Sequence, residues 1–271
     1  MNFSILMSIY YQERAQYFNQ AMCSIWQEQT IKPTEIVLVQ DGKLTDELYS
    51  AIDEWSFKLG EVLKIVTLKE NLGTGDAKNA GLKQCTQELV VIMDTDDICL
   101  PDRFEKQLNI FNNYDVDACG GWISEFHTDE NRIASYRRVP EAHHEVVKLS
   151  KKRMPVNHVT LMCKKEIMLK AGGYQKMLWL EDYYLVVRMI LAGAKFYNIQ
   201  STLVNVRSGF EQLQRRSGIR YALSELQLQQ EFLRLKFISH IEFFINVIVR
   251  FSIRIMPRVF IGIVYRRLRK L

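Results

Sequence analysis

Three carboxylates stand within four residues in the segment Asp94-Thr95-Asp96-Asp97, directly after the apolar run Leu89–Met93. Carboxylates this close repel one another unless a cation lies among them, and Mg²⁺ or Mn²⁺ binds carboxylate and phosphate oxygens together. A metal held in this way could neutralise a diphosphate leaving group during a displacement reaction. The alternative is a solvated acidic turn in which Asp97 or Asp102 caps the next helix.

A second acidic pair, Glu181-Asp182, directly precedes the helical run YYLVVRMILAG. The dipole at a helix N-terminus stabilises negative charge. A carboxylate held there can act as a general base toward a hydroxyl, which is a weak nucleophile at neutral pH. A plain helix cap is the alternative interpretation of this pair.

Short apolar runs alternate with helical patterns through the first 93 residues, which predicts a mainly parallel α/β sheet flanked by helices. The expected strands are Phe3–Ile9, Glu35–Val39, Leu63–Leu68 and Leu89–Met93, and the expected helices are Gln16–Trp26, Asp46–Phe57 and, after a glycine-rich opening, Gly73–Lys83. Ligands of such sheets bind at the carboxyl ends of the strands. Tyr10, Asp41 and the acidic turn should therefore lie close together.

The pattern loosens after about residue 115. The sequence still predicts a strand over Ala118–Phe126 and helices over Asp182–Ala192 and Tyr221–Phe237, with a polar stretch over Thr128–Arg153. We expect residues 1–220 to form one catalytic domain, with nucleotide binding up to about residue 115 and the acceptor side in 116–220. Residues 221–271 should form a helical, basic C-terminal region.

Composition places the chain among ordinary globular proteins, with 48% hydrophobic and 25% charged residues. The five cysteines are scattered without a CxxC pair, which argues against a disulfide framework or a zinc site. The N-terminus lacks the basic region of a signal peptide. We therefore expect a cytoplasmic protein.

The net charge of +5 is concentrated in the tail, because residues 234–271 hold nine Lys/Arg against one acid, Glu242. A nucleic-acid-binding protein usually spreads its bases over a folded face, so nucleic acid is not an expected partner. The segment Ile241–Tyr265 is apolar but is interrupted by arginines at positions 250, 254 and 258 and by Pro257. It is too interrupted to span a bilayer. It suits a helix lying on an anionic membrane surface, or one packed on the catalytic domain with its bases exposed.

The segment VIMDTDDICLPDRFEKQL resembles the DxD region of family-two inverting glycosyltransferases with the GT-A fold. Four further segments match the same family in its order: Ile9-Tyr10 at the end of the first strand, EIVLVQDG, ENLGTGDAKNAGL, and Leu180-Glu181-Asp182. The resemblance implies an enzyme that takes a sugar from a nucleotide-diphosphate donor, most simply a UDP-sugar.

The resemblance also implies residue roles on the donor side. Ile9 or Tyr10 would pack on the nucleobase, and Asp41 would accept a hydrogen bond from it. Lys78 and Asn79 would lie in the loop that approaches the nucleotide, with Lys78 in place of the arginine more usual in the family, which loses bidentate geometry.

Within the acidic turn, the resemblance implies that Asp96 ligates Mn²⁺ or Mg²⁺ and that Asp94 is shared between the metal and the ribose. Thr95 would belong to the same nucleotide-sugar site, and Asp97 would support the turn. Farther along, Gln212-Leu213-Gln214-Arg215-Arg216 echoes the QxxRW segment of processive relatives. Arg215 and Arg216 could close over the diphosphate, or belong to a solvated basic loop.

On the acceptor side, Asp182 would be the catalytic base and Glu181 would orient it or contact the acceptor. His158 could touch the donor phosphates or the acceptor, or be a core histidine. Trp179 could stack on a sugar ring or pack in the core. A single displacement by one hydroxyl should invert the anomeric centre.

The resulting hypothesis is a glycosyltransferase that extends a polyprenyl-diphosphate-linked glycan in bacterial O-antigen or capsule synthesis, peripheral on the inner face of the cell membrane. Another soluble or polyprenyl-phosphate acceptor is an alternative. A processive synthase would need several membrane spans, and a nucleotidyltransferase would need a glycine-rich loop after the first strand, where IYYQERAQ has no glycine. A non-catalytic sugar-nucleotide-binding module is the alternative outside enzymes.

Overall fold

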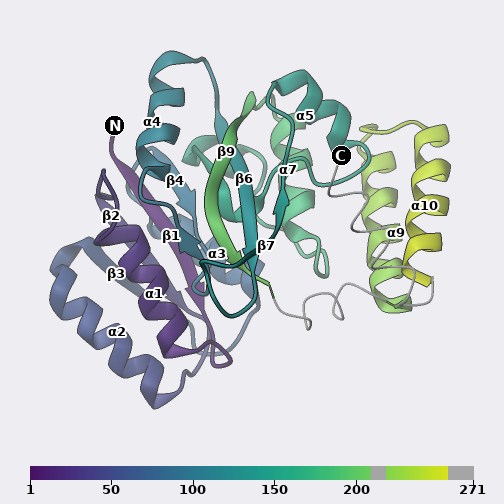
Figure 1. The fold of residues 1–271 in the computed structure, drawn as a ribbon. Coiled ribbons are helices and arrows are strands. Elements are labelled where there is room, and N and C mark those ends of the chain that lie inside the picture. Colours follow the sequence, from purple (N-terminus) through teal and green to yellow (C-terminus); the bar gives the residue numbers. More distant parts are fainter. Residues whose placement is uncertain (209–217, 256–271) are drawn as a thin grey trace.

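The structure is a computed structural model, and it describes residues 1–208 and 218–255. Within these residues one nine-stranded sheet runs through the molecule in the order β3-β2-β1-β4-β8-β6-β9-β5, with β7 paired to β6 (Figure 1). The strands are β1 Phe3–Ile9, β2 Glu35–Gln40, β3 Leu63–Thr67, β4 Leu89–Ile92, β5 Ile98–Cys99, β6 Ala118–Phe126, β7 Ile133–Arg137, β8 Met162–Lys164 and β9 Phe196–Arg207.

The helices follow the strands in chain order. They are α1 Ala15–Trp26, α2 Asp46–Leu59, α3 Thr74–Gln84, α4 Arg103–Asn113, α5 His143–Ser150, α6 Lys165–Lys170, α7 Glu181–Leu191, α9 Ile219–Arg234 and α10 His240–Ile255, with short 3-10 turns at Gly60–Val62 and His158–Thr160. The expected α/β class with a mainly parallel sheet and flanking helices is confirmed.

Strands β1 to β4 pair in parallel, which brings their carboxyl ends to one edge. Side chains of β1 alternate between the two faces, as the pleat of a strand requires. Phe3, Ile5, Met7 and Ile9 pack with α1, α2 and α4, whereas Leu6 packs with α3, α6 and α7 on the opposite face. Two helical layers therefore bury the sheet and fix where its edge lies.

Helix α3 lies unusually close to the sheet at Gly81. A Cβ at this position would come within 2.4 Å of the Leu6 side chain and 2.6 Å of the Val39 side chain. The absence of a side chain lets the helix approach β1 and β2. This close approach sets the position of Lys78, one turn earlier on the same helix.

The stretch Thr128–Arg153, for which the sequence indicated only polar character, holds β7 and α5. Strand β7 pairs with β6 in antiparallel register, and its exposure alternates between partly buried and exposed residues. Pairing with a long neighbouring strand stabilises a segment whose own hydrophobic pattern is weak. Strand β9 was missed for the same reason, because its mixed polar sequence is paired to both β6 and β5.

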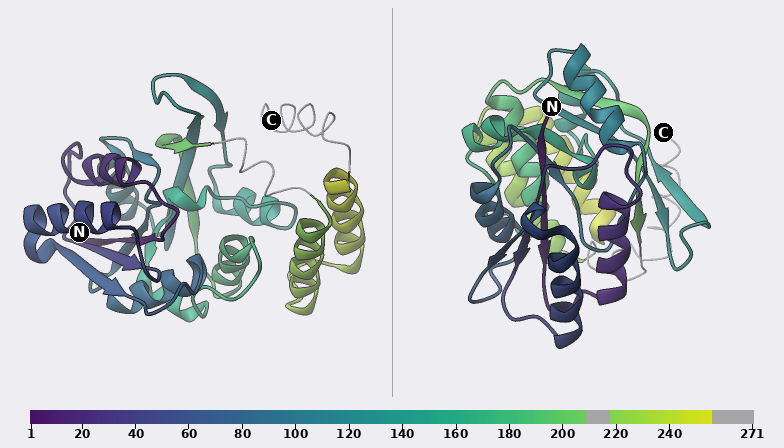
Figure 2. Two further views of the ribbon diagram at one scale, coloured as in Figure 1. Left: turned by 90° about the horizontal axis from the view of Figure 1, so that it is seen from below. Right: turned by 90° about the vertical axis from the view of Figure 1, so that its left-hand side faces the viewer.

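Helices α9 and α10 form a pair on the side of the molecule opposite α1 and α2 (Figures 1 and 2). A third apolar cluster, which includes Tyr184, Val187, Leu228 and Phe232, joins α7 to α9. The C-terminal helices therefore pack on the element that begins with the second acidic pair. A domain boundary at residue 220 remains a prediction.

Arg250 of α10 differs from the exposed arginine that both expectations for the basic segment assumed, whereas contact with a membrane stays a prediction. Arg250 is directed inward and pairs with Glu225 of α9 at 2.6 Å, so it does not form an exposed basic stripe. Arg254 and the residues beyond 255 lie outside the side chains that the structure describes. No helix in the described part of the chain is both long enough and apolar enough to cross a bilayer.

Candidate active site

A cavity of about 810 Å³ lies at the carboxyl edge of β1, β2 and β4 and extends toward α7, α9 and α10. It gathers all but one of the predicted site residues in the described part of the chain: Ile9, Tyr10, Asp41, Lys78, Asp94, Thr95, Asp96, His158, Trp179, Glu181 and Asp182. Arg215 and Arg216 lie outside the described residues.

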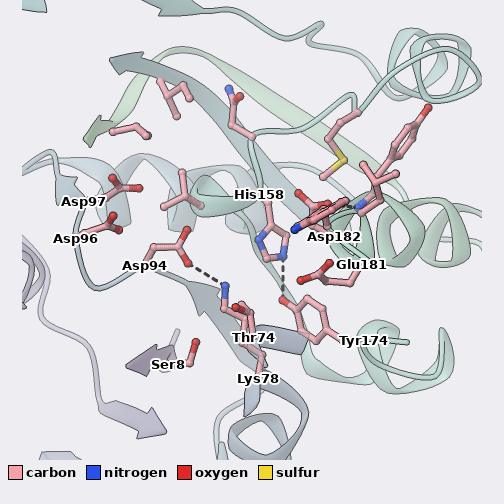
Figure 3. A pocket seen from close by; sticks show the side chains of 18 of the residues that line it. Ser8, Thr74, Lys78, Asp94, Asp96, Asp97, His158, Tyr174, Glu181 and Asp182 are labelled. Carbon is pink, nitrogen blue, oxygen red and sulfur yellow. Dashed lines mark hydrogen bonds and ion pairs between the residues drawn. The ribbon is translucent and has the colours of Figure 1, made fainter. Parts of the chain in front are cut away.

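Asp94 occupies the start of the acidic turn, just after β4. Lys78 Nζ donates to Asp94 Oδ1 at 2.9 Å, and the Lys78 side chain is only 2% exposed (Figure 3). Burial by itself would raise the pKa of Asp94, but the Lys78 ammonium outweighs it and holds that pKa below its ordinary value. The lysine thus keeps Asp94 ionised, although it is a single point charge in place of an arginine fork.

Asp97 faces the backbone that supports the turn. Its Oδ1 accepts from the Arg207 amide at 2.8 Å, while Arg207 Nε donates to the Asp96 carbonyl at 3.1 Å. The Arg207 guanidinium also lies 3.8 Å from the centre of the Tyr17 ring. The end of β9 therefore fastens the acidic turn, which agrees with the supporting role expected for Asp97.

Glu13, which the sequence argument missed, adds a further carboxylate to this end of the cavity. Thr95 Oγ1 donates to Glu13 Oε2 at 3.1 Å. Burial, together with the negative charges of Glu13 and Asp94, raises the pKa of Asp96 to about 7. The position of Glu13 in the polar segment after β1, at the same sheet edge as Asp41, was the available signal.

The crowding of Glu13, Asp94 and Asp96 disfavours three ionised carboxylates, and a hard divalent cation would relieve it. The described residues contain no three His, Cys, Asp or Glu side chains already gathered as a metal-binding group. The oxygen donors are of the type that Mn²⁺ or Mg²⁺ requires, with phosphate oxygens free to complete the set.

A fully buried arginine lies behind the turn. Arg103 Nη2 donates to the Ile92 carbonyl at 3.0 Å, and its Nε donates to Gln107 Oε1 at 3.0 Å. Gln107 in turn donates to the carbonyls of Cys119 and Thr160. This network joins α4 to the end of β4, to β6 and to the segment beside His158, and it places a positive charge behind the carboxylates.

Asp41 uses both carboxylate oxygens to hold the loop that opens α3. Oδ1 accepts from the Leu72 amide at 2.7 Å, and Oδ2 accepts from the Gly73 amide at 3.0 Å. Asp41 also lines the cavity, where a ligand could reach it. The hydrogen bond expected between Asp41 and a nucleobase stays a prediction.

Asn79 bonds the backbone of Tyr174. It is not among the residues that line the cavity. Its amide donates to the Tyr174 carbonyl at 2.7 Å and accepts from the Tyr174 amide at 2.8 Å. The side chain joins α3 to the loop before α7 and positions Tyr174, and its contact with the nucleotide stays a prediction.

His158 lies between Asp94 and the Glu181-Asp182 pair (Figure 3). Its Nε2 shares a hydrogen bond of 2.9 Å with the Tyr174 hydroxyl. Burial lowers the pKa of His158 to about 4, with a further contribution from Lys78. The imidazole is therefore neutral at physiological pH and can donate or accept without adding charge.

Glu181 and Asp182 form the first turn of α7, as the sequence indicated. Trp179, two residues earlier, has a positive φ of 62°, which is strained for a bulky residue. Its ring is 42% exposed and stacks on Tyr221 of α9, with centroids 5.6 Å apart. The strained backbone presents an aromatic face to the cavity beside the acidic pair.

Residues 4–170 match the family described as Glycosyl transferase family 2. The chain belongs to this family. Its sequence is similar to that of a UDP-Gal:alpha-D-GlcNAc-diphosphoundecaprenol beta-1,3-galactosyltransferase of Escherichia coli. The two are 38% identical over 266 residues, which cover 98% of this chain and 95% of the relative. This chain is also 36% identical over 269 residues, 99% of each chain, to the amylovoran biosynthesis glycosyltransferase AmsE of Erwinia amylovora.

Solved structures share the fold of this glycosyltransferase. Staphylococcus aureus TarS 1-349 in complex with UDP-GlcNAc superposes with a TM-score of 0.65 at 17% identity, covering 86% of this chain and 67% of that one. The mannosyltransferase PcManGT of Pyrobaculum calidifontis, in complex with GDP-Man and Mn2+, gives a TM-score of 0.64 at 18% identity, covering 86% of this chain and 64% of that one.

The buried, neutral His158 predicts a specific pH dependence of the glycosyltransferase's stability. Below pH 6.5 the unfolded chain binds a proton at this histidine, whereas the folded chain does so only near pH 4. Folding is therefore penalised by about 3 kcal/mol as pH falls from 7 to 4, at 1.36 kcal/mol per pKa unit. The test is the free energy of unfolding by denaturant, measured for the wild type and for His158→Gln at pH 7, 5.5 and 4.

The carboxylates contribute to both proteins, so the comparison isolates the histidine. We expect the wild type to lose stability relative to His158→Gln across this pH range. A difference between the two that stays constant with pH would contradict the lowered pKa.

Proposed function

We propose that this glycosyltransferase moves a sugar from a UDP-sugar to a hydroxyl of a polyprenyl-diphosphate-linked glycan in the synthesis of a bacterial surface polysaccharide such as O-antigen or capsule. The observation that carries the proposal is a single cavity with Asp94 and Asp96 at one end and Asp182 at another, separated by His158. The names of the E. coli and E. amylovora relatives, similar over nearly the whole chain, support the acceptor class and the pathway.

The donor would bind at the carboxyl edge of β1, β2 and β4. Ile9 or Tyr10 would pack on the base and Asp41 would hydrogen-bond it, while Lys78 and Thr95 would lie beside the nucleotide. Asp96 would hold Mn²⁺ or Mg²⁺, with Asp94 shared between the metal and the ribose. The metal supplies positive charge to the departing diphosphate. The crowded carboxylates described above support this assignment.

The acceptor would bind on the α7 side. Asp182 would take the proton from the attacking hydroxyl, and the N-terminus of α7 stabilises its charge before that transfer. Glu181 would orient the acceptor, and neutral His158 could hydrogen-bond either substrate. Because one hydroxyl displaces the nucleotide in one step, the anomeric centre is inverted. The exposed Trp179 ring would stack on the acceptor sugar.

Helix α10 supports a peripheral position on the inner face of the cell membrane. Its packed side combines Phe243, which joins the third apolar cluster, with polar contacts: Asn246 donates to Gln229 and to the Lys151 carbonyl, and Lys151 pairs with Glu242. Its outward side is apolar and exposed, and consists of Ile241, Phe244, Ile245, Ile248 and Val249. An apolar face directed away from the protein, beside a basic tail, fits insertion into the surface of an anionic bilayer.

Donor binding should depend on both nucleotide and metal. We expect UDP-sugars with Mn²⁺ to raise the melting temperature and EDTA to cancel the increase, because the carboxylates repel a diphosphate without a cation. Asp96→Asn should lose the metal-dependent part, whereas Asp53→Asn on the exposed side of α2 should retain it. Stabilisation that survives chelation would overturn the metal assignment. Failure of every nucleotide sugar to bind would instead favour a non-donor function.

Asp182→Asn removes the proposed base and leaves the donor end untouched. We expect kcat for sugar transfer to fall by about 10²–10⁴-fold, with the dissociation constant for UDP nearly unchanged. Transfer can be measured with an alkyl diphosphate-linked N-acetylglucosamine acceptor. Asp102→Asn, which removes an exposed carboxylate paired with Lys106 on α4, is the matched control. Normal turnover in Asp182→Asn would remove the base assignment.

Membrane binding should depend on the exposed face of α10. We expect the double variant Ile245→Glu and Ile248→Glu to bind phosphatidylglycerol vesicles at least tenfold more weakly in sedimentation assays, because two charges replace inserted apolar side chains. Leu169→Glu, on an equally exposed apolar position of α6, should bind like the wild type. Equal binding by the double variant would place the membrane contact elsewhere.

A further inference from the structure

Charge is sorted along the cavity. The carboxylates of the acidic turn and Glu13 occupy the donor end, where Lys78 is buried against Asp94. The other bases that line the cavity lie together on the acceptor side, and they are Arg137, Arg138, Arg153 and Arg250. The carboxylates that line this side of the cavity are Glu125 of β6, Glu181 and Asp182 of α7, and Glu225 of α9, so the arginines balance them and cations are concentrated at this end and not at the donor end.

Three of these arginines converge on one short backbone segment. Arg137 Nη2 donates a hydrogen bond to the Met154 carbonyl at 2.9 Å, and Arg250 Nη2 donates one to the Lys152 carbonyl. Arg153 stands between these two acceptors in the chain. Strand β7, the segment after α5 and helix α10 are far apart in the sequence, so only the folded chain brings these three arginines to the lining of one cavity.

The arginine cluster adjoins the helix that carries the proposed base. The Arg250 guanidinium lies 5.7 Å from the centre of the Tyr183 ring, and Tyr183 directly follows Asp182. The Tyr183 hydroxyl donates to the Ser150 carbonyl at 2.6 Å, which ties α7 to the end of α5 near Arg153. An acceptor with its hydroxyl at Asp182 can therefore extend toward the cluster.

Part of the hydrogen-bonding capacity of Arg250 is unused. Its Nη1 pairs with Glu225 at 2.6 Å. Its Nε is buried and has no hydrogen-bond partner within residues 1–208 and 218–255. Helix α10 thus presents a guanidinium to the cavity on its packed side and an apolar surface on the other, an arrangement suited to a ligand that joins an anionic group to a lipid.

We propose that Arg137, Arg153 and Arg250 bind the diphosphate of the lipid-linked acceptor; this inference rests on the function proposed above. Guanidinium groups bind phosphate oxygens in bidentate geometry. The donor and the acceptor each carry a diphosphate into the same cavity. Neutralising the two diphosphates by different groups holds them at different ends. The donor diphosphate is bound at the carboxylate end through a cation, whereas the acceptor diphosphate is bound directly by the arginines. The cluster also makes a diphosphate-linked sugar a better acceptor than an uncharged glycoside.

The binding test uses hexyl diphosphate, which has the proposed anionic group but no sugar. Calorimetry is done with the full chain at saturating UDP and Mn²⁺, so that the donor end is already filled. We expect Arg153→Gln and Arg137→Gln each to weaken binding at least tenfold, and Arg153→Lys to fall between Arg153→Gln and the wild type because it keeps the charge but loses the fork. Lys152→Gln, an exposed neighbour outside the cavity lining, should bind like the wild type.

Equal binding of hexyl diphosphate by the wild type and both glutamine variants would overturn the proposal. A transfer assay separates this failure from failure of the proposed function. If sugar diphosphate lipids accept sugar and Arg153→Gln leaves their KM unchanged, the arginine site is wrong and the function stands. If they accept no sugar but hexyl diphosphate binding depends on Arg153, the anion site stands and the proposed acceptor is wrong.

In an active enzyme, we expect loss of the Arg153 guanidinium to affect the KM of the diphosphate-linked acceptor and not that of the donor. Arg153→Gln should raise KM at least tenfold for an alkyl diphosphate-linked N-acetylglucosamine and leave the KM for the UDP-sugar unchanged. Activity toward the matching uncharged alkyl glycoside should be little affected. An equal loss with both acceptors would contradict diphosphate recognition and indicate a structural effect of the substitution.

Discussion

The structure depends most on how it holds several carboxylates close together at the end of β4. Asp94 is paired with buried Lys78, and Asp97 is fastened to the Arg207 amide. The buried guanidinium of Arg103 lies behind them on the Ile92 carbonyl. Each cation comes from a different element, so α3, β9 and α4 must all be in place before the acidic turn has a defined shape. The remaining negative charge, on Asp96 and Glu13, could bind a divalent cation, and that cation could in turn bind a diphosphate.

The cavity is built by two parts of the chain with different architecture. The parallel strands β1 to β4 bring the residues of the proposed donor side to one edge, which is a general property of such sheets. The proposed acceptor side is assembled from segments with no common periodicity: the end of β7, the segment after α5, the first turn of α7 and the paired helices α9 and α10. His158 and Tyr174 lie where the two parts meet, and Asn79 fixes that junction through the Tyr174 backbone.

Helix α10 links the chemistry of the cavity to the surface of the protein. Polar contacts through Asn246 and Arg250 hold its inner side on α9 and on the segment after α5. Its apolar side is left outward, which is the reverse of an ordinary amphipathic helix on a globular protein. The same helix can therefore contribute to an anion site within the cavity and to contact with a lipid surface outside it.

The sequence by itself determined the class of fold and grouped most of the residues that line the proposed donor end of the cavity. Strand and helix periodicity is local, and residues at the ends of parallel strands meet because of the sheet topology, so Tyr10, Asp41 and Asp94 could be grouped without coordinates. The first turn of α7 was also evident, since an acidic pair before an apolar helical run is a local pattern. Only the tertiary structure decided what depends on long-range contact. It bonded the Asn79 amide to the Tyr174 backbone, added Glu13 to the acidic end and turned Arg250 inward to Glu225. It also gathered three arginines from distant segments, because packing between elements, and not local spacing, sets which side chains face the same cavity.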